Sequence, residues 1–176
     1  MDTFLKNFID RLESLPDKPS LDTLRTCVLE TDGRQLPIKE YTSFSDQGYK
    51  RNVVHVSDKC EIAVICFKKE QFTPIHDHGG SIGVTIVWEG TMTEELFVKQ
   101  PTGMIAPTFT RKYRKSELAY INTATIHRIS NTHIDDLVTI NIYFPPLTLM
   151  NLYNLENTQV EKWFADYSSL KDLIPR

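Results

Sequence analysis

Three histidines in this sequence have the spacing of a metal site. His76 and His78 lie two residues apart, so on an extended strand both imidazoles point to the same side. His127 follows much later and could join them from a separate strand. Three imidazoles can hold Zn(II), Fe(II), Mn(II), Ni(II) or Cu(II) and leave coordination positions open for a small molecule. His55 and His133 lack such a pattern, and we expect them to stand outside the site.

The composition limits the setting in which this chemistry takes place. The chain has 176 residues, about the size of one domain, and 40% of them are hydrophobic, which is enough for a core. The net charge of -3 gives no reason to expect nucleic acid or a membrane surface as a partner. No hydrophobic run approaches the ~20 residues of a membrane span, and the first residues lack a signal-peptide segment. We therefore expect a cytoplasmic protein that is a monomer or a weak homodimer.

Helical spacing marks the N-terminal part of the chain. Hydrophobic residues recur at intervals of three and four from Phe4 to Leu15, which predicts an amphipathic helix. Ser20 is a suitable N-cap for a second helix, and residues 39–41 indicate a third, weaker one. We expect residues 1–48 to form a helical layer on the domain that follows.

Short segments rich in β-branched and aromatic residues follow from residue 49 onward, separated by turn-forming residues. Glu89 and Gly90, between two such segments, predict a hairpin turn. Without helices between them, these strands predict an antiparallel sandwich or barrel over residues 49–146, with residues 147–176 wrapped around its outside in a single domain, 1–176. The seven predicted strands are Arg51–Val56, Glu61–Lys68, Gly83–Glu89, Met92–Lys99, Leu118–Asn122, Ile126–Ser130 and Leu137–Tyr143.

Two motifs make the prediction more specific. The spacing from His78 through Gly83 to Gly90, together with that from His127 to Asn131, resembles the two motifs of the cupin superfamily. The predicted fold is therefore mainly β, a cupin barrel or jelly roll with N-terminal α-helices. In that superfamily a carboxylate often occupies the position of Gly83. This chain therefore retains three neutral ligands and leaves one coordination position without a protein ligand.

The resemblance extends to thiol dioxygenases of the cysteine dioxygenase family, over residues 49–146. It implies that the protein uses O2 to oxidise a small carboxylate-bearing thiol, either L-cysteine to cysteine sulfinic acid or 3-mercaptopropionate. It also implies that His76, His78 and His127 bind Fe(II). The segments that carry the resemblance, in the family's order and spacing, are Tyr49–Asn52, Ile65–Phe67, Ile75–His78, Trp88–Phe97, Ala119–Asn122 and Ile142–Pro146.

The same resemblance assigns roles around the substrate. Arg51 would pair with the substrate carboxylate, and its planar guanidinium suits that group. Such a charge-assisted contact is worth ~1.5–3 kcal/mol, or roughly tenfold to a hundredfold in discrimination. Tyr143 would reach the site from a strand end as the catalytic tyrosine. Thr139 and Asn141 alternate with it and should face the same side, so all three are candidate substrate contacts.

The sequence departs from the animal pattern at three positions. Gly83 stands where animal enzymes have a cysteine that crosslinks to the tyrosine, and in this it is similar to bacterial members. Asn141 stands where the family usually has a histidine, and Thr139 where it usually has a serine. An amide can donate or accept a hydrogen bond but cannot relay a proton as imidazole can. The choice between cysteine and 3-mercaptopropionate therefore stays open.

Two other functions are compatible with three histidines in a cupin. One is a different metal-dependent enzyme, such as a dioxygenase for a non-thiol substrate or an isomerase. The other is a non-enzymatic cupin that binds a small molecule or a metal as a sensor. A metal spectrum that thiols do not perturb would favour the first, and a filled metal site that never consumes O2 would favour the second.

Other residues near these motifs are expected to be structural. Asp77 lies between two predicted ligands, so on a strand it should point to the opposite side. We expect it to make a turn or surface contact. Asn131 is expected to fix the loop after His127. The spacing of the three cysteines fits no zinc motif, so we expect buried, reduced thiols at Cys27, Cys60 and Cys66.

Overall fold

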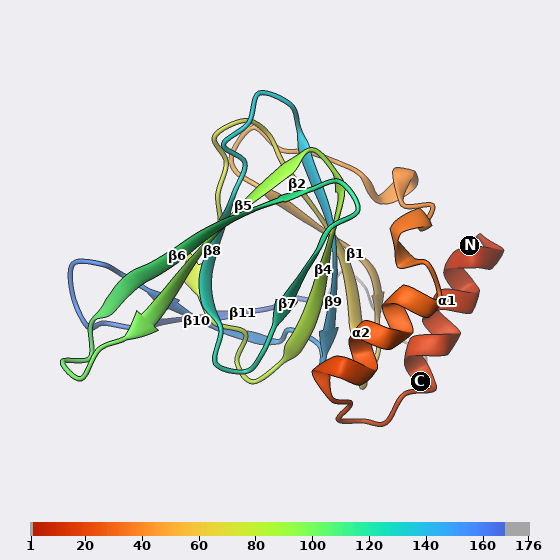
Figure 1. The fold of residues 1–176 in the computed structure, drawn as a ribbon, viewed down its shortest axis with the longest axis horizontal. Coiled ribbons are helices and arrows are strands. Elements are labelled where there is room, and N and C mark those ends of the chain that lie inside the picture. The colour runs from red at the N-terminus through yellow and green to blue at the C-terminus, as the bar shows by residue number, and fades with distance from the viewer. Residues whose placement is uncertain (1, 168–176) are drawn as a thin grey trace.

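A computed structural model of the protein describes residues 2–167. Within that range, two α-helices and two short 3₁₀ helices precede eleven β-strands (Figure 1). The helices are α1 Thr3–Glu13, α2 Leu21–Glu30, η1 Gly33–Gln35 and η2 Lys39–Tyr41. The strands are β1 Lys50–Val56, β2 Glu61–Phe67, β3 Ile75–His76, β4 Ile82–Glu89, β5 Thr91–Lys99, β6 Ile105–Arg114, β7 Leu118–Ile121, β8 Ile126–Ser130, β9 Leu137–Phe144, β10 Leu149–Tyr153 and β11 Glu161–Phe164.

The two predicted α-helices are confirmed. The Ser20 hydroxyl accepts a hydrogen bond from the Thr23 amide at 3.0 Å and so caps α2. The hydrophobic side of α1 is buried, including Phe8 and Leu12. The third predicted helix is present as the single 3₁₀ turn η2.

The strands form two antiparallel sheets (Figure 1). The first has the order β1-β2-β9-β4-β7, and the second has the order β11-β10-β3-β8-β5-β6. α1 and α2 cover the outer face of the first sheet, where Phe8 belongs to the same hydrophobic cluster as Ile86 and Ile140. β2 and β9 are therefore buried along their whole lengths, which explains their nearly unbroken hydrophobic runs. The inner face of this sheet is left to form the walls of the site.

The hairpin predicted at Glu89 and Gly90 is wrong. β4 pairs with β7 and β9, whereas β5 pairs with β6 and β8, so this turn carries the chain from one sheet to the other. Gly90 has a φ of +83°, and a Cβ there would lie 2.4 Å from the carbonyl oxygen of Asp136. Glycine is needed here because another segment of the chain passes close to the turn.

All seven predicted strands are present, and the described residues contain four more. β3 has only two residues, too few for any periodic pattern. β6 is long, but most of its side chains are exposed and it contains Pro107, so its sequence lacks clear alternation. β10 and β11 belong to the segment predicted to wrap the outside, where they extend the second sheet. Residues 168–176 of that segment lie outside the described residues.

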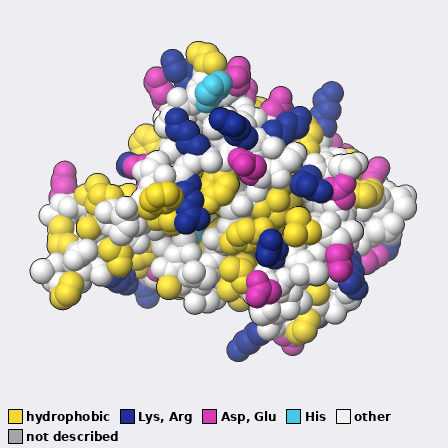
Figure 2. All heavy atoms as spheres, in the orientation of Figure 1, with side chains coloured by type: hydrophobic (Ala, Val, Ile, Leu, Met, Phe, Trp, Pro, Cys, Tyr) yellow, Lys and Arg dark blue, Asp and Glu magenta, His cyan; other side chains and the backbone are white. Residues whose placement is uncertain are grey.

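The surface and the cysteines complete the description of the fold. Acidic, basic and hydrophobic side chains all occur across the face in Figure 2. Among the described residues, no helix has both the length and the hydrophobicity to cross a membrane. The three cysteines are buried free thiols, as predicted.

Candidate metal centre

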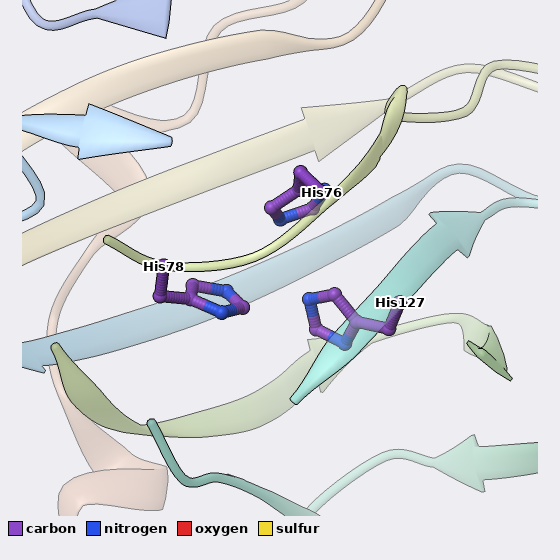
Figure 3. A group of neighbouring side chains, drawn as sticks. All are labelled: His76, His78 and His127. Atoms are coloured by element: carbon purple, nitrogen blue, oxygen red, sulfur yellow. The ribbon is translucent and has the colours of Figure 1, made fainter. Parts of the chain in front are cut away.

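The three predicted histidine ligands come together between the two sheets. His76 lies on β3 and His127 on β8, and the two residues are direct partners in the strand pairing. His78 follows two residues after His76 and completes the group. The ring centroids are 4.8–4.9 Å apart, and the three imidazoles point toward one another (Figure 3). One nitrogen from each ring lies within 4.8 Å of the others, close enough to share one ion.

Burial affects these imidazoles, and it keeps His76 and His78 in the neutral form that binds metals. Their exposed fractions are 6% for His76, 2% for His78 and 3% for His127. Burial, followed by the nearby His127, lowers the pKa of His76 to about 3. Burial and the neighbouring histidines also hold the pKa of His78 well below its usual value. Neutral rings leave a lone pair free for a metal at neutral pH.

A hydrogen bond fixes the tautomer of His76, whereas His78 has no such bond within residues 2–167. Nδ1 of His76 donates to the carbonyl oxygen of Pro74 at 2.9 Å, so its Nε2 carries the lone pair. Both nitrogens of His78 are buried and have no hydrogen-bond partner among the described residues. A buried polar atom without a partner is rare in proteins. A metal ion held by these three residues would satisfy one of the two nitrogens of His78, so the residues present fit a bound metal.

A buried carboxylate that the sequence analysis missed stands behind His127. Glu94 on β5 is 3% exposed, and its Oε1 accepts a hydrogen bond from His127 Nδ1 at 2.7 Å. Its Oε2 accepts another from the Tyr113 hydroxyl at 3.1 Å. Such a carboxylate orients a histidine ligand and raises its basicity. The available signal is weak, because Glu94 is one of two adjacent glutamates on a strand that also carries Thr93 and Lys99.

Thr139, Asn141 and Tyr143 face the interior together, as predicted. They line a small cavity of about 30 Å³ whose walls also include His76 and His127. The Asn141 amide is bonded within the first sheet. It accepts from the Thr85 hydroxyl at 2.8 Å and donates to the Thr139 hydroxyl at 2.9 Å. The structure gives Asn141 no hydrogen bond to Tyr143, so the amide orients its two threonine neighbours.

Tyr143 lies beside the histidines. Its ring stacks on that of His78 with the centroids 5.8 Å apart, and the residue is 4% exposed. Burial and the nearby Glu61 carboxylate raise the pKa of its phenol, which is therefore protonated at neutral pH. Gly83 is its partner in the strand pairing. A Cβ at Gly83 would lie 3.0 Å from the ring of Tyr143 and 2.8 Å from the carbonyl oxygen of Ile142, so the tyrosine packs where a side chain would be.

Arg51 lies close to Tyr143 but forms no part of the cavity wall. Its Nη2 forms an ion pair with the carboxylate of Glu61 and donates to the Tyr167 hydroxyl at 3.3 Å. Its Nε is buried without a partner among the described residues. Sequence reasoning missed both Glu61, whose only signal is a charge at the start of a buried strand, and Tyr167.

The remaining predictions concern neighbours of the ligands. Asp77 faces away from the histidines and accepts hydrogen bonds from the Gly79 amide, at 3.0 Å, and from Asn151, which confirms the predicted turn contact. Asn131 is completely buried and fixes the loop after β8, as predicted: its side chain donates to the carbonyl oxygens of Asp135 in that loop and of Phe67 at the end of β2. His55 bonds to Glu13 and His133 lies beside Asp135, so neither belongs to the triad.

The fold and this site define a class of protein. Two antiparallel sheets with three histidines between them form a cupin, also called a double-stranded β-helix. The solved structure of a conserved protein with a double-stranded β-helix domain from Klebsiella pneumoniae is similar, with a TM-score of 0.55 and 16% identity. The match covers 69% of this chain and 97% of that one. The predicted mainly β cupin fold with N-terminal helices is confirmed.

The family follows from the sequence. The family model of cysteine dioxygenase type I matches residues 29–156, and the chain belongs to this family. Cysteine dioxygenase type 1 of Homo sapiens is 28% identical over 120 residues, which are 65% of this chain and 60% of that protein. Cysteine dioxygenase type 1 of Bos taurus is also 28% identical, over 135 residues, 73% of this chain and 67% of that protein. The matched part of the chain thus spans less than two thirds of the human relative.

Proposed function

We propose that this protein is a thiol dioxygenase that oxidises a small carboxylate-bearing thiol with O2, with Fe(II) as the metal. L-Cysteine, giving cysteine sulfinic acid, and 3-mercaptopropionate are the candidate substrates. Both oxygen atoms of O2 end on the substrate sulfur, so a thiol RSH and O2 give RSO2H with no other reductant. The observation that carries the proposal is the convergence of three buried imidazoles in a chain of the cysteine dioxygenase type I family.

The ligand set suits a thiol substrate. His76, His78 and His127 would hold the metal, and among the described residues this group includes no carboxylate. When bound, Fe(II) would stabilise the substrate as a thiolate and bring O2 next to sulfur. Three neutral ligands leave the positive charge uncompensated, which favours an anionic sulfur ligand over a neutral one.

The chain's own residues would bind and orient the substrate. The Tyr143 phenol stays protonated at neutral pH, since burial raises its pKa further, and it can donate a hydrogen bond toward the substrate from its place beside His78. Thr139 and Asn141 add polar groups on the same wall. Arg51 offers its unpartnered Nε–H to a carboxylate. The closed, mostly hydrophobic surroundings keep bulk water away from the reacting sulfur.

The direct test is an anaerobic loading experiment. Protein loaded with Fe(II) is mixed with cysteine, 3-mercaptopropionate or cysteamine, O2 is admitted, and O2 uptake and sulfinate are measured. We expect uptake of one O2 per sulfinate with at least one thiol that carries a carboxylate. The proposal fails if no thiol supports O2 uptake.

The metal assignment has its own test. His127→Ala should lose bound iron, because one of three ligands is removed, while His133→Ala should retain it. Metal content after gel filtration measures both. If the two variants keep the same amount of iron, the third ligand has been misassigned.

A further inference from the structure

Glu61 has an unusual position for a charged residue. It opens β2, pairs across the sheet with Tyr143 on β9, and its exposed fraction is 0%. Every group that touches its carboxylate donates a hydrogen bond. Arg51 contacts Oε1, while the Leu147 amide, at 3.0 Å, and the Tyr167 hydroxyl, at 2.7 Å, both contact Oε2. Contacts that only donate suit the ionised carboxylate.

The guanidinium that it contacts is enclosed as well. The side chain of Arg51 is 17% exposed, and its guanidinium carbon lies 5.7 Å from the ring centroids of both Trp163 and Tyr167. In such surroundings water screens charges poorly, so each charge acts strongly on its neighbours. The Nε–H edge of Arg51 remains without a partner among the described residues.

These contacts affect what Arg51 can select. An isolated guanidinium attracts any anion. A guanidinium in contact with a buried carboxylate belongs to a pair with no net charge. An incoming carboxylate at Nε would be attracted by Arg51 and repelled by Glu61 a short distance behind it. A neutral carbonyl or amide oxygen of the same shape would accept the same hydrogen bond without that repulsion.

We propose that Glu61 is a specificity-determining residue that lowers the preference of the site for thiols with a carboxylate over neutral thiols of the same length. This inference rests on the proposed function and extends its substrate class. The substrates would be short thiols whose far end carries a hydrogen-bond acceptor, whether charged or neutral. Glu61 touches no substrate in this arrangement and acts through Arg51.

The test compares two ligands that differ only in charge, 3-mercaptopropionate and 3-mercaptopropionamide. Their dissociation constants are measured by calorimetry on anaerobic Fe(II)-loaded protein, where no turnover takes place. In the wild-type protein the ratio of the two dissociation constants, amide over carboxylate, should be below ten. Glu61→Gln removes the charge with little change of shape and should raise this ratio about tenfold, because Arg51 is then uncompensated.

Glu95→Gln is the matched control. Glu95 pairs with Arg128 on another part of the protein, so the same chemical change there should leave the ratio at the wild-type value. Circular dichroism shows whether Glu61→Gln is folded, since it leaves Arg51 buried without a partner charge. If this variant does not fold, the ratio in the wild-type protein decides. A ratio below ten supports the inference, and a ratio of ten or more overturns it.

The other outcomes are also decisive. A folded Glu61→Gln whose ratio rises less than threefold overturns the inference, as does a wild-type protein that binds neither ligand. Selective binding as expected but no O2 uptake with any thiol would refute the proposed function while leaving the role of Glu61 intact. O2 uptake with a thiol, together with an unchanged ratio in Glu61→Gln, would support the proposed function and refute the role of Glu61.

Discussion

The three imidazoles of the candidate metal centre differ in what holds their second nitrogen. His76 donates to a backbone carbonyl, His127 donates to the carboxylate of Glu94, and His78 has no partner among the described residues. The carboxylate pushes electron density toward the metal-binding nitrogen of His127 more than a carbonyl can. Of the three ligands, His127 is therefore the one whose strength depends most on another side chain.

Replacing Glu94 should weaken the metal centre without removing a ligand. Glu94→Gln keeps the shape and an acceptor for His127 but loses the negative charge, so metal affinity should fall by about tenfold to a hundredfold. Competition with a chelator measures the affinity. Glu95→Gln, one residue along β5, is the control and should bind metal like the wild type. Equal affinities in the two variants would contradict a role for Glu94.

Burial of the histidines predicts a pH dependence in the metal-free protein. The pKa of His76 is lowered to about 3 in the folded state, whereas an unfolded chain has the ordinary value of 6.5. Between these values the unfolded state binds a proton that the folded state does not, so stability falls as the pH falls. For His76 alone we expect a loss of about 1.4 kcal/mol per pH unit below 6.5, and His78 acts in the same direction.

Urea denaturation of chelator-treated protein between pH 7 and pH 5 measures this effect. The variant His76→Gln, which cannot take up a proton, should show a smaller slope. A stability that does not change over this range would mean that the rings are accessible to protons in the folded state.

The residues of the site could be predicted from the sequence only in part. The convergence of the three histidines could be predicted, because the spacing of His76 and His78 on a strand fixes their common direction and the motif after His127 is specific. Glu94 and Glu61 could not. Charged residues on strands are usually exposed, and only the three-dimensional arrangement shows that these two are buried against a histidine and an arginine.

At the scale of elements, the shortest strand, β3, positions one of the three histidines. β3 holds His76 and is only two residues long, so its own ladder with β8 contributes little rigidity. It is fixed on its other side by β10. Asp77, between the two ligands, accepts hydrogen bonds from Asn151 and, at 2.6 Å, from the Tyr153 hydroxyl. This side chain ties the ligand segment to β10.

Asp77→Ala should therefore loosen the ligand segment. We expect a loss of about 2 kcal/mol in the free energy of unfolding, because several charge-assisted hydrogen bonds disappear. We also expect weaker metal binding. Asp135→Ala is the control, since its side chain is mostly exposed beside His133, and it should cost less than about 0.5 kcal/mol. Denaturant titration and chelator competition measure both effects, and equal losses in both variants would argue against the tether.

The elements were predictable to the extent that their own residues carry a pattern. β2 and β9 are buried on both faces and read as hydrophobic runs, and α1 has clear helical spacing. β3 is too short for a pattern, and β6 is largely exposed on both faces. The hairpin predicted at Gly90 is wrong because the local sequence cannot distinguish a hairpin turn from a turn that leads into the other sheet.

At the scale of the whole molecule, the N-terminal helices stabilise the fold from outside the site. Phe8 is 1% exposed in the cluster that joins the helices to the first sheet, whereas Phe4, on the same helix, is 41% exposed. Phe8→Ala should cost about 3–5 kcal/mol in unfolding free energy, and Phe4→Ala less than about 1 kcal/mol. Thermal and urea unfolding measure both. At temperatures where Phe8→Ala is still folded, its metal affinity should be that of the wild type.

The internal cavity limits how a reactant reaches the metal centre. Its volume of about 30 Å³ is enough for a water molecule or two. We therefore expect the entry of a mercapto acid to be coupled to rotation of side chains in the cavity wall. The association rate should then report the frequency of this rotation, with a steeper temperature dependence than the viscosity of the solvent alone would give.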